Sequence, residues 1–171
     1  VAVFAGALRP WHGIHCIAEA WRLFDGAGPS LLIVGDGPGR ELLQRMGARV
    51  TGAVPHADVP SYLAQADIAL APYARDAPGY FSPLKLFEYL AAGLATIAGD
   101  LPGIRDVVGP ETAVLIPPGD AEALAGAVAP RAMRDSEIVV VVDGRVAIDL
   151  ALVGEVPRRR GGWRRLNPYP A

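Results

Sequence analysis

The chain has 171 residues, of which 51% are apolar and 20% charged, and its formal net charge is -2. This composition excludes a disordered chain, and the length suits one soluble domain that buries about two thirds of its unfolded surface. The balanced charge provides no general basic field for nucleic acid, so any anion site must be local. Cys16 is the single cysteine, which excludes an internal disulfide and a cysteine-based zinc site and fits a reducing cytosol.

The sequence carries no obvious targeting segment. No stretch approaches the ~20 apolar residues of a membrane span, and the start lacks the basic region of a secretory signal. We therefore expect a cytoplasmic protein without a transmembrane segment. Because the sequence opens at Val1, directly in a strand pattern, we expect it to be a piece of something longer.

Over the first 128 residues, short apolar runs alternate with amphipathic stretches, a pattern typical of a parallel sheet covered by helices on both faces. In chain order, strands are predicted at 1–5, 31–34, 49–54, 68–70, 95–98 and 113–116. Helices are predicted between and after them, at 13–24, 40–46, 59–66, 83–92, 104–108 and 121–128. The expected fold class is α/β with a Rossmann-like sheet.

Several helix ends have recognisable capping residues. Ser82 is expected to cap the helix over 83–92, and Gly93 to end it in the left-handed conformation. Asp58 and Asp120 are the expected N-caps of two other helices, and residues 36–39 are expected to form a turn.

The pattern changes after Val128, so we divide the chain into a domain over 1–128 and an extension over 129–171. Two apolar runs flank Asp143-Gly144, which predicts a hairpin within 138–152. The arginine-rich residues 157–165 follow without helical or strand periodicity. We interpret them as a solvated, flexible end; an anionic partner is the alternative.

Ligands of open parallel sheets bind outside the carboxyl ends of the strands, which directs attention to three loops. The first, over 6–13, follows a strand with Gly6 and places Arg9 and His12 before a helix. Backbone amides at a helix start and an arginine fork suit a phosphate. The structural alternative is a tight turn with an exposed Arg9 and a packed Trp11.

The second segment, over 81–93, combines an anion-binding helix start with a carboxylate. Ser82 and Lys85 accompany amides of the first helical turn. Glu88 lies about 7.5 Å further along the axis than Pro83, roughly the span from a diphosphate to its ribose hydroxyls. The spacing suits a nucleoside diphosphate; a carboxylate on the outer surface of an amphipathic helix is the alternative.

The third group comprises the strand exits 35–39 and 52–56, where small residues would allow a flat base to lie against the backbone, although isolated turns of this kind are mostly structural. His15 and His56 have no companions at metal-ligand spacing, so we expect no metal ion.

Together and in order, these segments resemble the nucleotide-binding C-terminal domain of GT-B retaining glycosyltransferases of group 1, or family 4. The motifs that carry the resemblance are GALRPWHG, LLIVGDGPGRE, VTGAVPHADVPSYLAQADIALAPY, SPLKLFEYLAAG, and DLPGIRDVV leading to TAVLIPPGDAEALAGAV. The resemblance covers residues 1–128. It implies one half of a GT-B fold, with a nucleotide diphosphate sugar as substrate, no cofactor or metal, and an acceptor held by an N-terminal domain that this sequence lacks.

By the same resemblance, Glu88 matches the glutamate that binds the ribose hydroxyls, and Val54 and Pro55 match the turn beside the base. Ser82, Pro83 and Leu84 match the segment whose amides hold the diphosphate, although Pro83 has no amide to give. The remaining donor-site residues of the resemblance are Gly6, Arg9, His12 and Lys85, and Arg9 and Lys85 are expected to stabilise the leaving group.

The sequence departs from the family pattern at three positions. Ala7 replaces the usual arginine, His12 replaces the lysine, and Tyr80 replaces the first glutamate of the E-x7-E pair. The resemblance implies a donor-binding fragment that transfers sugar poorly alone, and that is cytoplasmic or held at the membrane periphery through the absent domain. The departures favour a non-catalytic nucleotide- or partner-binding module as the alternative; a nucleotide-sugar epimerase of the same architecture is a third.

Overall fold

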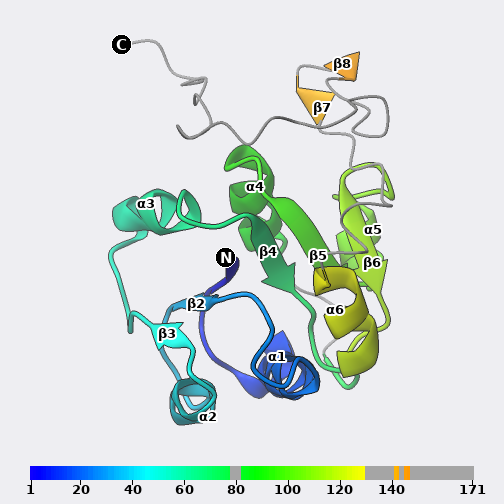
Figure 1. Ribbon diagram of the computed structural model, residues 1–171. Coiled ribbons are helices and arrows are strands. Elements are labelled where there is room, and N and C mark those ends of the chain that lie inside the picture. Colours follow the sequence, from blue (N-terminus) through cyan, green and yellow to red (C-terminus); the bar gives the residue numbers. More distant parts are fainter. Residues whose placement is uncertain (78–81, 130–140, 143–144, 147–171) are drawn as a thin grey trace.

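The computed structural model describes residues 1–77, 82–129, 141–142 and 145–146. Its main sheet has six parallel strands in the order β3-β2-β1-β4-β5-β6 (Figure 1). The strands are β1 (Ala2–Ala5), β2 (Leu31–Val34), β3 (Arg49–Val50), β4 (Ile68–Ala71), β5 (Ala95–Gly99) and β6 (Ala113–Ile116). This strand order reverses between β1 and β4, which creates the topological switch point of a Rossmann-like fold.

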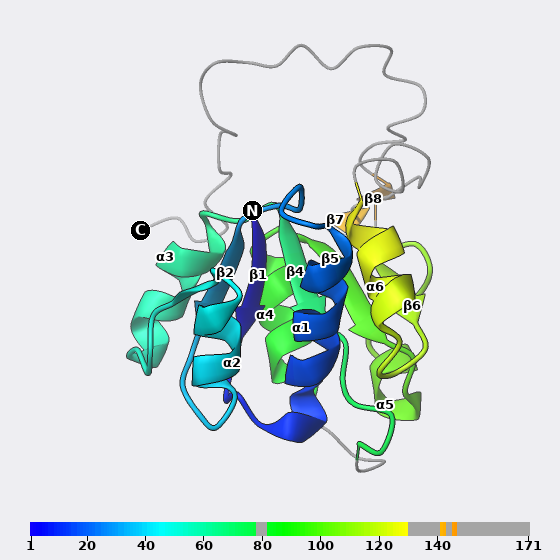
Figure 2. The ribbon, with the colours of Figure 1, turned by 60° about the horizontal axis from the view of Figure 1, so that its bottom comes forward.

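Six α-helices in the described part of the chain cover the sheet. They are α1 (Ile14–Leu23), α2 (Arg40–Arg45), α3 (Val59–Leu63), α4 (Leu84–Ala91), α5 (Pro102–Arg105) and α6 (Ala121–Val128). Two 3-10 turns, η1 (Pro10–His12) and η2 (His56–Asp58), lead into α1 and α3. Figure 2 shows α1, α2 and α6 on one face of the sheet and α4 on the other.

The core divides into two layers because successive strand residues point to opposite faces. In β1, Ala2 and Phe4 join the layer under α1, α2 and α6, whereas Val3 and Ala5 join the layer under α3, α4 and α5. All four residues are buried. Burial on both faces explains why the strands read as continuously apolar runs.

The predicted Rossmann-like parallel sheet is confirmed, with differences at element ends. The predicted strand over 49–54 ends at Val50, because Gly52 forms an isolated antiparallel bridge to Gly35 instead of continuing the parallel ladder. The predicted helix over 59–66 ends at Leu63. The helix predicted over 104–108 begins at Pro102, since proline suits the first helical turn.

Two of the predicted caps are confirmed and two are wrong. Gly93, which follows the C-cap residue Ala92 of α4, takes φ +67°, and Asp120 accepts a 2.8 Å hydrogen bond from the amide of Ala123. Ser82 does not cap α4, because the helix begins at Leu84 and Pro83 occupies the N-cap position. Asp58 makes no side-chain cap bond, because the turn η2 runs directly into α3 and holds Asp58 in a helical conformation.

This difference between the two aspartates predicts different effects of their removal. Asp120→Ala should lower the free energy of unfolding by about 1 kcal/mol, because the Ala123 amide loses its acceptor. Asp58→Ala is the matched control, and should change stability by less than about 0.5 kcal/mol. Urea unfolding of the two variants measures both values, and equal losses would contradict the assignment.

Beyond residue 129, the structure describes β7 (Val141–Val142) and β8 (Arg145–Val146), which pair antiparallel. The rest of the hairpin predicted over 138–152 and the arginine-rich residues 157–165 lie outside the described residues, as does Tyr80. Among the helices that the structure describes, none is both long and apolar enough to cross a bilayer.

Candidate functional site

The site lies where β1 and β4 separate. The two strands pair only at Ala2 with Ile68 and at Val3 with Ala69. Beyond these pairs the hydroxyl of Tyr89, from α4, lies between the strands: it accepts from the Ala5 amide at 2.8 Å and lies 3.2 Å from the carbonyl oxygen of Leu70. Tyr89 thus holds α4 against the switch point, and burial raises the pKa of its phenol, which keeps the donating proton in place.

The loop that leaves β1 gathers basic side chains. Gly6 takes φ +136°, and Arg9 is exposed with its guanidinium carbon 5.8 Å from the centre of the Trp11 ring. His12 Nδ1 lies 2.6 Å from the carbonyl oxygen of Ala7, which can only accept, so Nδ1 carries the proton. Burial lowers the pKa of His12 most, and the charge of Lys85 lowers it further, whereas the hydrogen bond from His12 to Ala7 raises it. His12 therefore tends to be neutral near pH 7.

Lys85, in the first turn of α4, points beneath this loop. Its Nζ is fully buried and has no hydrogen-bond partner in the described part of the chain. It lies 4.4 Å from the centre of the Phe4 ring and 5.6 Å from that of Tyr73. Burial lowers the pKa of Lys85 to about 8, and the charge of Glu88 only partly counteracts that effect. The ammonium is thus held at the site without an ordinary polar partner.

The loop after β4 is fixed against the loop after β1 through Tyr73, a buried residue at φ +53°. Its carbonyl accepts from the amide of Gly119, and the next residue, Ala74, donates to the carbonyl of Trp11. A Cβ on Gly13 would lie 2.8 Å from the Tyr73 nitrogen, so the two loops touch backbone to backbone. The positive φ of Tyr73 is strained for a residue other than glycine, and such a conformation persists only where its surroundings enforce it.

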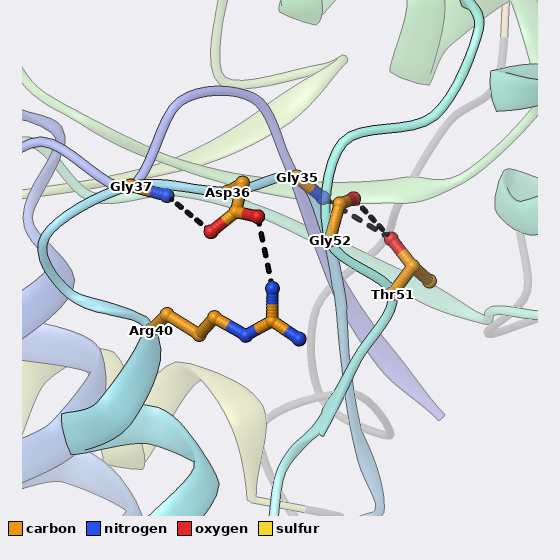
Figure 3. Close-up of polar contacts among 6 residues, drawn as sticks. All are labelled: Gly35, Asp36, Gly37, Arg40, Thr51 and Gly52. Atoms are coloured by element: carbon orange, nitrogen blue, oxygen red, sulfur yellow. Dashed lines mark hydrogen bonds and ion pairs between the residues drawn. The ribbon is translucent and has the colours of Figure 1, made fainter.

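The exits of β2 and β3 form the other end of this edge (Figure 3). Asp36 accepts from the amide of Gly37 and from Arg40 Nη1, at 2.8 and 2.9 Å. The amide of Gly35 donates to the hydroxyl of Thr51, whose side chain in turn donates to Gly52. The glycines at 35 and 37 are needed for close approach to the β1 loop, which is a structural role, whereas Gly52 faces only the tips of Asp36 and Arg40.

Glu88 connects α4 to the β3 exit. Its Oε1 lies 3.6 Å from Nδ1 of His56, and its side chain is 32% exposed, against 86% for His56. Neighbouring Val54 is half-buried and Pro55 is exposed. The predicted ribose-binding carboxylate therefore lies beside the predicted base-binding turn.

The structure thus brings most predicted site residues to one edge of the sheet. Lys85 joins Gly6 and His12, and Glu88 joins the turn of Val54 and Pro55. The start of α4 is open: Ser82 is exposed, Leu84 is 67% exposed, and no side chain from the described residues caps the helix. Trp11, treated as packed in the structural alternative, is 41% exposed.

Three aromatic residues of the site were missed in the sequence. Phe4 and Tyr73 surround the Lys85 ammonium, and Tyr89 separates the strands. The position of Phe4 within one apolar strand and of Tyr73 two residues after another was an available signal, whereas nothing in the sequence marks the partner of the Tyr89 hydroxyl.

A metal site has no obvious ligands here. Within the described ranges, no group of three or more His, Cys, Asp or Glu side chains is placed to hold an ion. Cys16 is buried in the core, and burial raises the pKa of its thiol to about 12, so it is unsuited to act as a thiolate ligand.

These features define a Rossmann-like domain of the kind found in GT-B glycosyltransferases. Residues 1–131 match the family model described as glycosyl transferases group 1, and the chain belongs to this family. The resemblance inferred from the motifs is thereby confirmed.

Two curated relatives are similar over three quarters of the chain. One is TuaC of Bacillus subtilis (strain 168), described as a teichuronic acid biosynthesis glycosyltransferase, at 34% identity over 128 residues. The other is the 2-deoxystreptamine N-acetyl-D-glucosaminyltransferase of Streptomyces fradiae, at 32% identity over 139 residues. Each match covers 75% of this chain and 32% of the relative, so the chain spans about a third of their length.

Solved structures agree on the fold. Anabaena HepE in complex with UDP and glucose matches with a TM-score of 0.63 and 20% identity, over 80% of this chain and 39% of that one. The catalytic domain of the cholesterol-α-glucosyltransferase of Helicobacter pylori matches with a TM-score of 0.55 and 15% identity, over 73% of this chain and 81% of that one.

Proposed function

We propose that this chain is the donor-binding part of a retaining glycosyltransferase, and that it holds the nucleoside diphosphate of an activated sugar at the carboxyl edge of its sheet. One observation carries the proposal: α4 presents a carboxylate and an ammonium within one turn. Glu88 faces His56 after β3, and Lys85 faces Gly6 after β1. The helix therefore offers an acceptor for ribose hydroxyls and positive charge for phosphate on the same edge.

Two further features support this proposal. The HepE structures contain UDP or UDP-glucose, and the two curated relatives are named as glycosyltransferases. Arg9 and Lys85 lie at the loop after β1, where their positive charges would stabilise the charge that develops on the departing diphosphate, and His12 would contribute there only in its protonated form. We therefore propose that positively charged side chains, rather than a metal ion or a cofactor, balance the charge of the diphosphate. Excess chelator should leave donor affinity unchanged.

The acceptor is expected to bind elsewhere, on a domain beyond this chain. We propose that the 171-residue chain binds donor but does not transfer sugar alone. We propose a cytoplasmic location, with which the free thiol of Cys16 and the proposed substrate are consistent. Any attachment to a membrane surface would come through the other domain.

Binding of nucleoside diphosphates to the 171-residue chain, measured by calorimetry, tests the proposal. We expect UDP or another member of a panel with GDP, ADP and TDP to bind, and its nucleoside to bind more weakly because it lacks phosphate. If no member of the panel binds, the chain is not a donor site. Binding without transfer after addition of the remaining domain would instead favour the non-catalytic module.

Glu88→Gln should weaken binding of that nucleoside diphosphate by roughly 1 to 3 kcal/mol, because an amide replaces only part of a charge-assisted acceptor for two hydroxyls. Calorimetry on the variant measures the loss. Glu41→Gln is the control, since Glu41 pairs with Arg45 on the exposed surface of α2. Wild-type affinity in a folded Glu88→Gln protein would give Glu88 a structural role only.

A further inference from the structure

A hollow of about 440 Å³ lies between the ends of α1 and α2, which Figure 2 shows side by side on one face of the sheet. Sites for small molecules range upward from about 300 Å³. Both helices run back from the carboxyl edge, and the loops after them lead into β2 and β3, so the hollow lies at the edge where the strands begin. The ten residues of α1, about 15 Å of helix, separate it from the loop after β1. The hollow is therefore distinct from the proposed donor site.

One wall of the hollow is apolar and held in place. Trp21, Leu42 and Met46 line this wall, and all three are half-buried. The indole nitrogen of Trp21 donates to the carbonyl of Pro29 at 3.0 Å, and its ring meets that of Phe24 edge to face, with 5.6 Å between the centroids. Because the single polar group of the indole is already bonded, the ring offers a ligand a fixed apolar surface.

The rim of the hollow carries one cation and one anion that do not pair with each other. Arg22 and Asp25 are both exposed, and both line the hollow. In the part of the chain that the structure describes, neither side chain takes part in an ion pair or a hydrogen bond. Arg45, the other cation of the rim, is bound to Glu41 at 2.8 Å. Arg22 and Asp25 are thus the two charged groups of the rim that are available to a ligand, and their charges cancel.

The position of Asp25 is unfavourable for folding. Its carboxylate follows the last turn of α1, where the negative end of the helix dipole favours a cation such as Arg22 and disfavours an anion. Asp25 also takes φ +46°, a conformation that glycine adopts at a lower cost. Residues with a strained backbone are concentrated at binding sites, so a role in holding a ligand would explain why an aspartate is present.

These groups together match the chemistry of a sugar ring. A pyranose has a face of C–H groups that packs on an aromatic ring, and hydroxyls that both donate and accept hydrogen bonds. Ionised Asp25 only accepts and Arg22 only donates, so the two side chains satisfy both functions of the hydroxyls. A strongly charged ligand would be repelled by one of them.

We propose that this hollow binds an uncharged saccharide, with a sugar ring against Trp21 and its hydroxyls bonded to Arg22 and Asp25. The proposal goes beyond the donor function and does not depend on it. In a glycosyltransferase, a site at this edge would hold a part of a saccharide that is remote from the reacting sugar.

Indole NMR of the full 171-residue chain tests the proposal, because Trp11 and Trp21 lie at opposite ends of α1. The three tryptophans give three indole N–H resonances, which are assigned by replacing each tryptophan in turn with phenylalanine. The probes are the methyl glycosides of glucose, galactose, mannose and N-acetylglucosamine at millimolar concentration. We expect at least one probe to shift the Trp21 resonance saturably and to leave that of Trp11 unchanged. If no probe shifts the Trp21 resonance, or if only Trp11 responds, the proposal is overturned.

Asp25→Asn provides a second readout, because asparagine has a similar shape and also tolerates a positive φ. We expect affinity for the glycoside that binds to fall roughly tenfold, because the amide replaces only part of a charge-assisted acceptor. The urea midpoint should stay equal or rise, since a charge disfavoured by the helix dipole is removed. Asp58→Asn is the matched control, because Asp58 is exposed, lies outside the hollow and makes no side-chain cap bond.

The two variants separate a local effect from a general one. Unchanged glycoside affinity in Asp25→Asn, or an equal loss in Asp58→Asn, would overturn the role of Asp25 in the site. Nucleoside diphosphate binding is measured on the same variants and should stay at the wild-type value, because the hollow and the donor site lie at opposite edges of the sheet.

Discussion

Gly35→Ala should lower the free energy of unfolding by roughly 2 to 5 kcal/mol, because two backbone segments meet at this position. A Cβ on Gly35 would lie 2.0 Å from the carbonyl oxygen of Gly6 and 2.9 Å from its carbon. Neither atom belongs to a side chain that could turn away. Gly35 also has φ +149°, so an L-residue is strained there even before the contact is considered.

A variant at a second glycine shows how much of the loss in stability comes from the close contact and how much from the backbone conformation. Gly47 has φ +81°, and a Cβ added to it would meet nothing within 4 Å. Gly47→Ala should therefore lower the free energy of unfolding only through backbone strain, by about 1 to 2 kcal/mol. Urea unfolding of both variants measures the difference. Similar losses would mean that the β1 and β2 loops separate easily and that their contact does not fix the proposed donor site.

Most of the fold could be predicted from the sequence because its signals are local. The six apolar runs are short, and Gly93 and Asp120 mark helix ends through their own backbone or side chain. The errors occur where a neighbouring residue changes the outcome. Ser82 is a good capping residue in isolation, but Pro83 takes the N-cap position, and the turn η2 before α3 removes the need for Asp58 as a cap.

The site was predictable only in part, for a related reason. Motif order placed Glu88 and Lys85 on one helix, and helical spacing gave their separation. Burial of the Lys85 ammonium could not be inferred, because it depends on Phe4 in β1 and Tyr73 after β4, far away in sequence. The same holds for Tyr89, because its hydroxyl contacts Ala5, which is 84 positions away in the sequence, and Leu70, which is 19 positions away.

Tyr89→Phe should lower the free energy of unfolding by about 2 kcal/mol, because the buried amide of Ala5 loses its acceptor and Leu70 loses a donor. The hydroxyl lies where β1 and β4 no longer pair, so no strand can replace it.

Its removal should also release the part of α4 that carries Lys85 and Glu88, and nucleoside diphosphate affinity should fall by roughly tenfold, about 1.4 kcal/mol, although Tyr89 itself is expected to touch no ligand. Tyr62→Phe, in the same core layer, is the control and should change both quantities little. A destabilised Tyr89→Phe protein with full affinity would show that α4 keeps its position through its apolar contacts alone. Loss of both would identify the tyrosine hydroxyl as the group that couples the separation of β1 and β4 to the geometry of the proposed donor site.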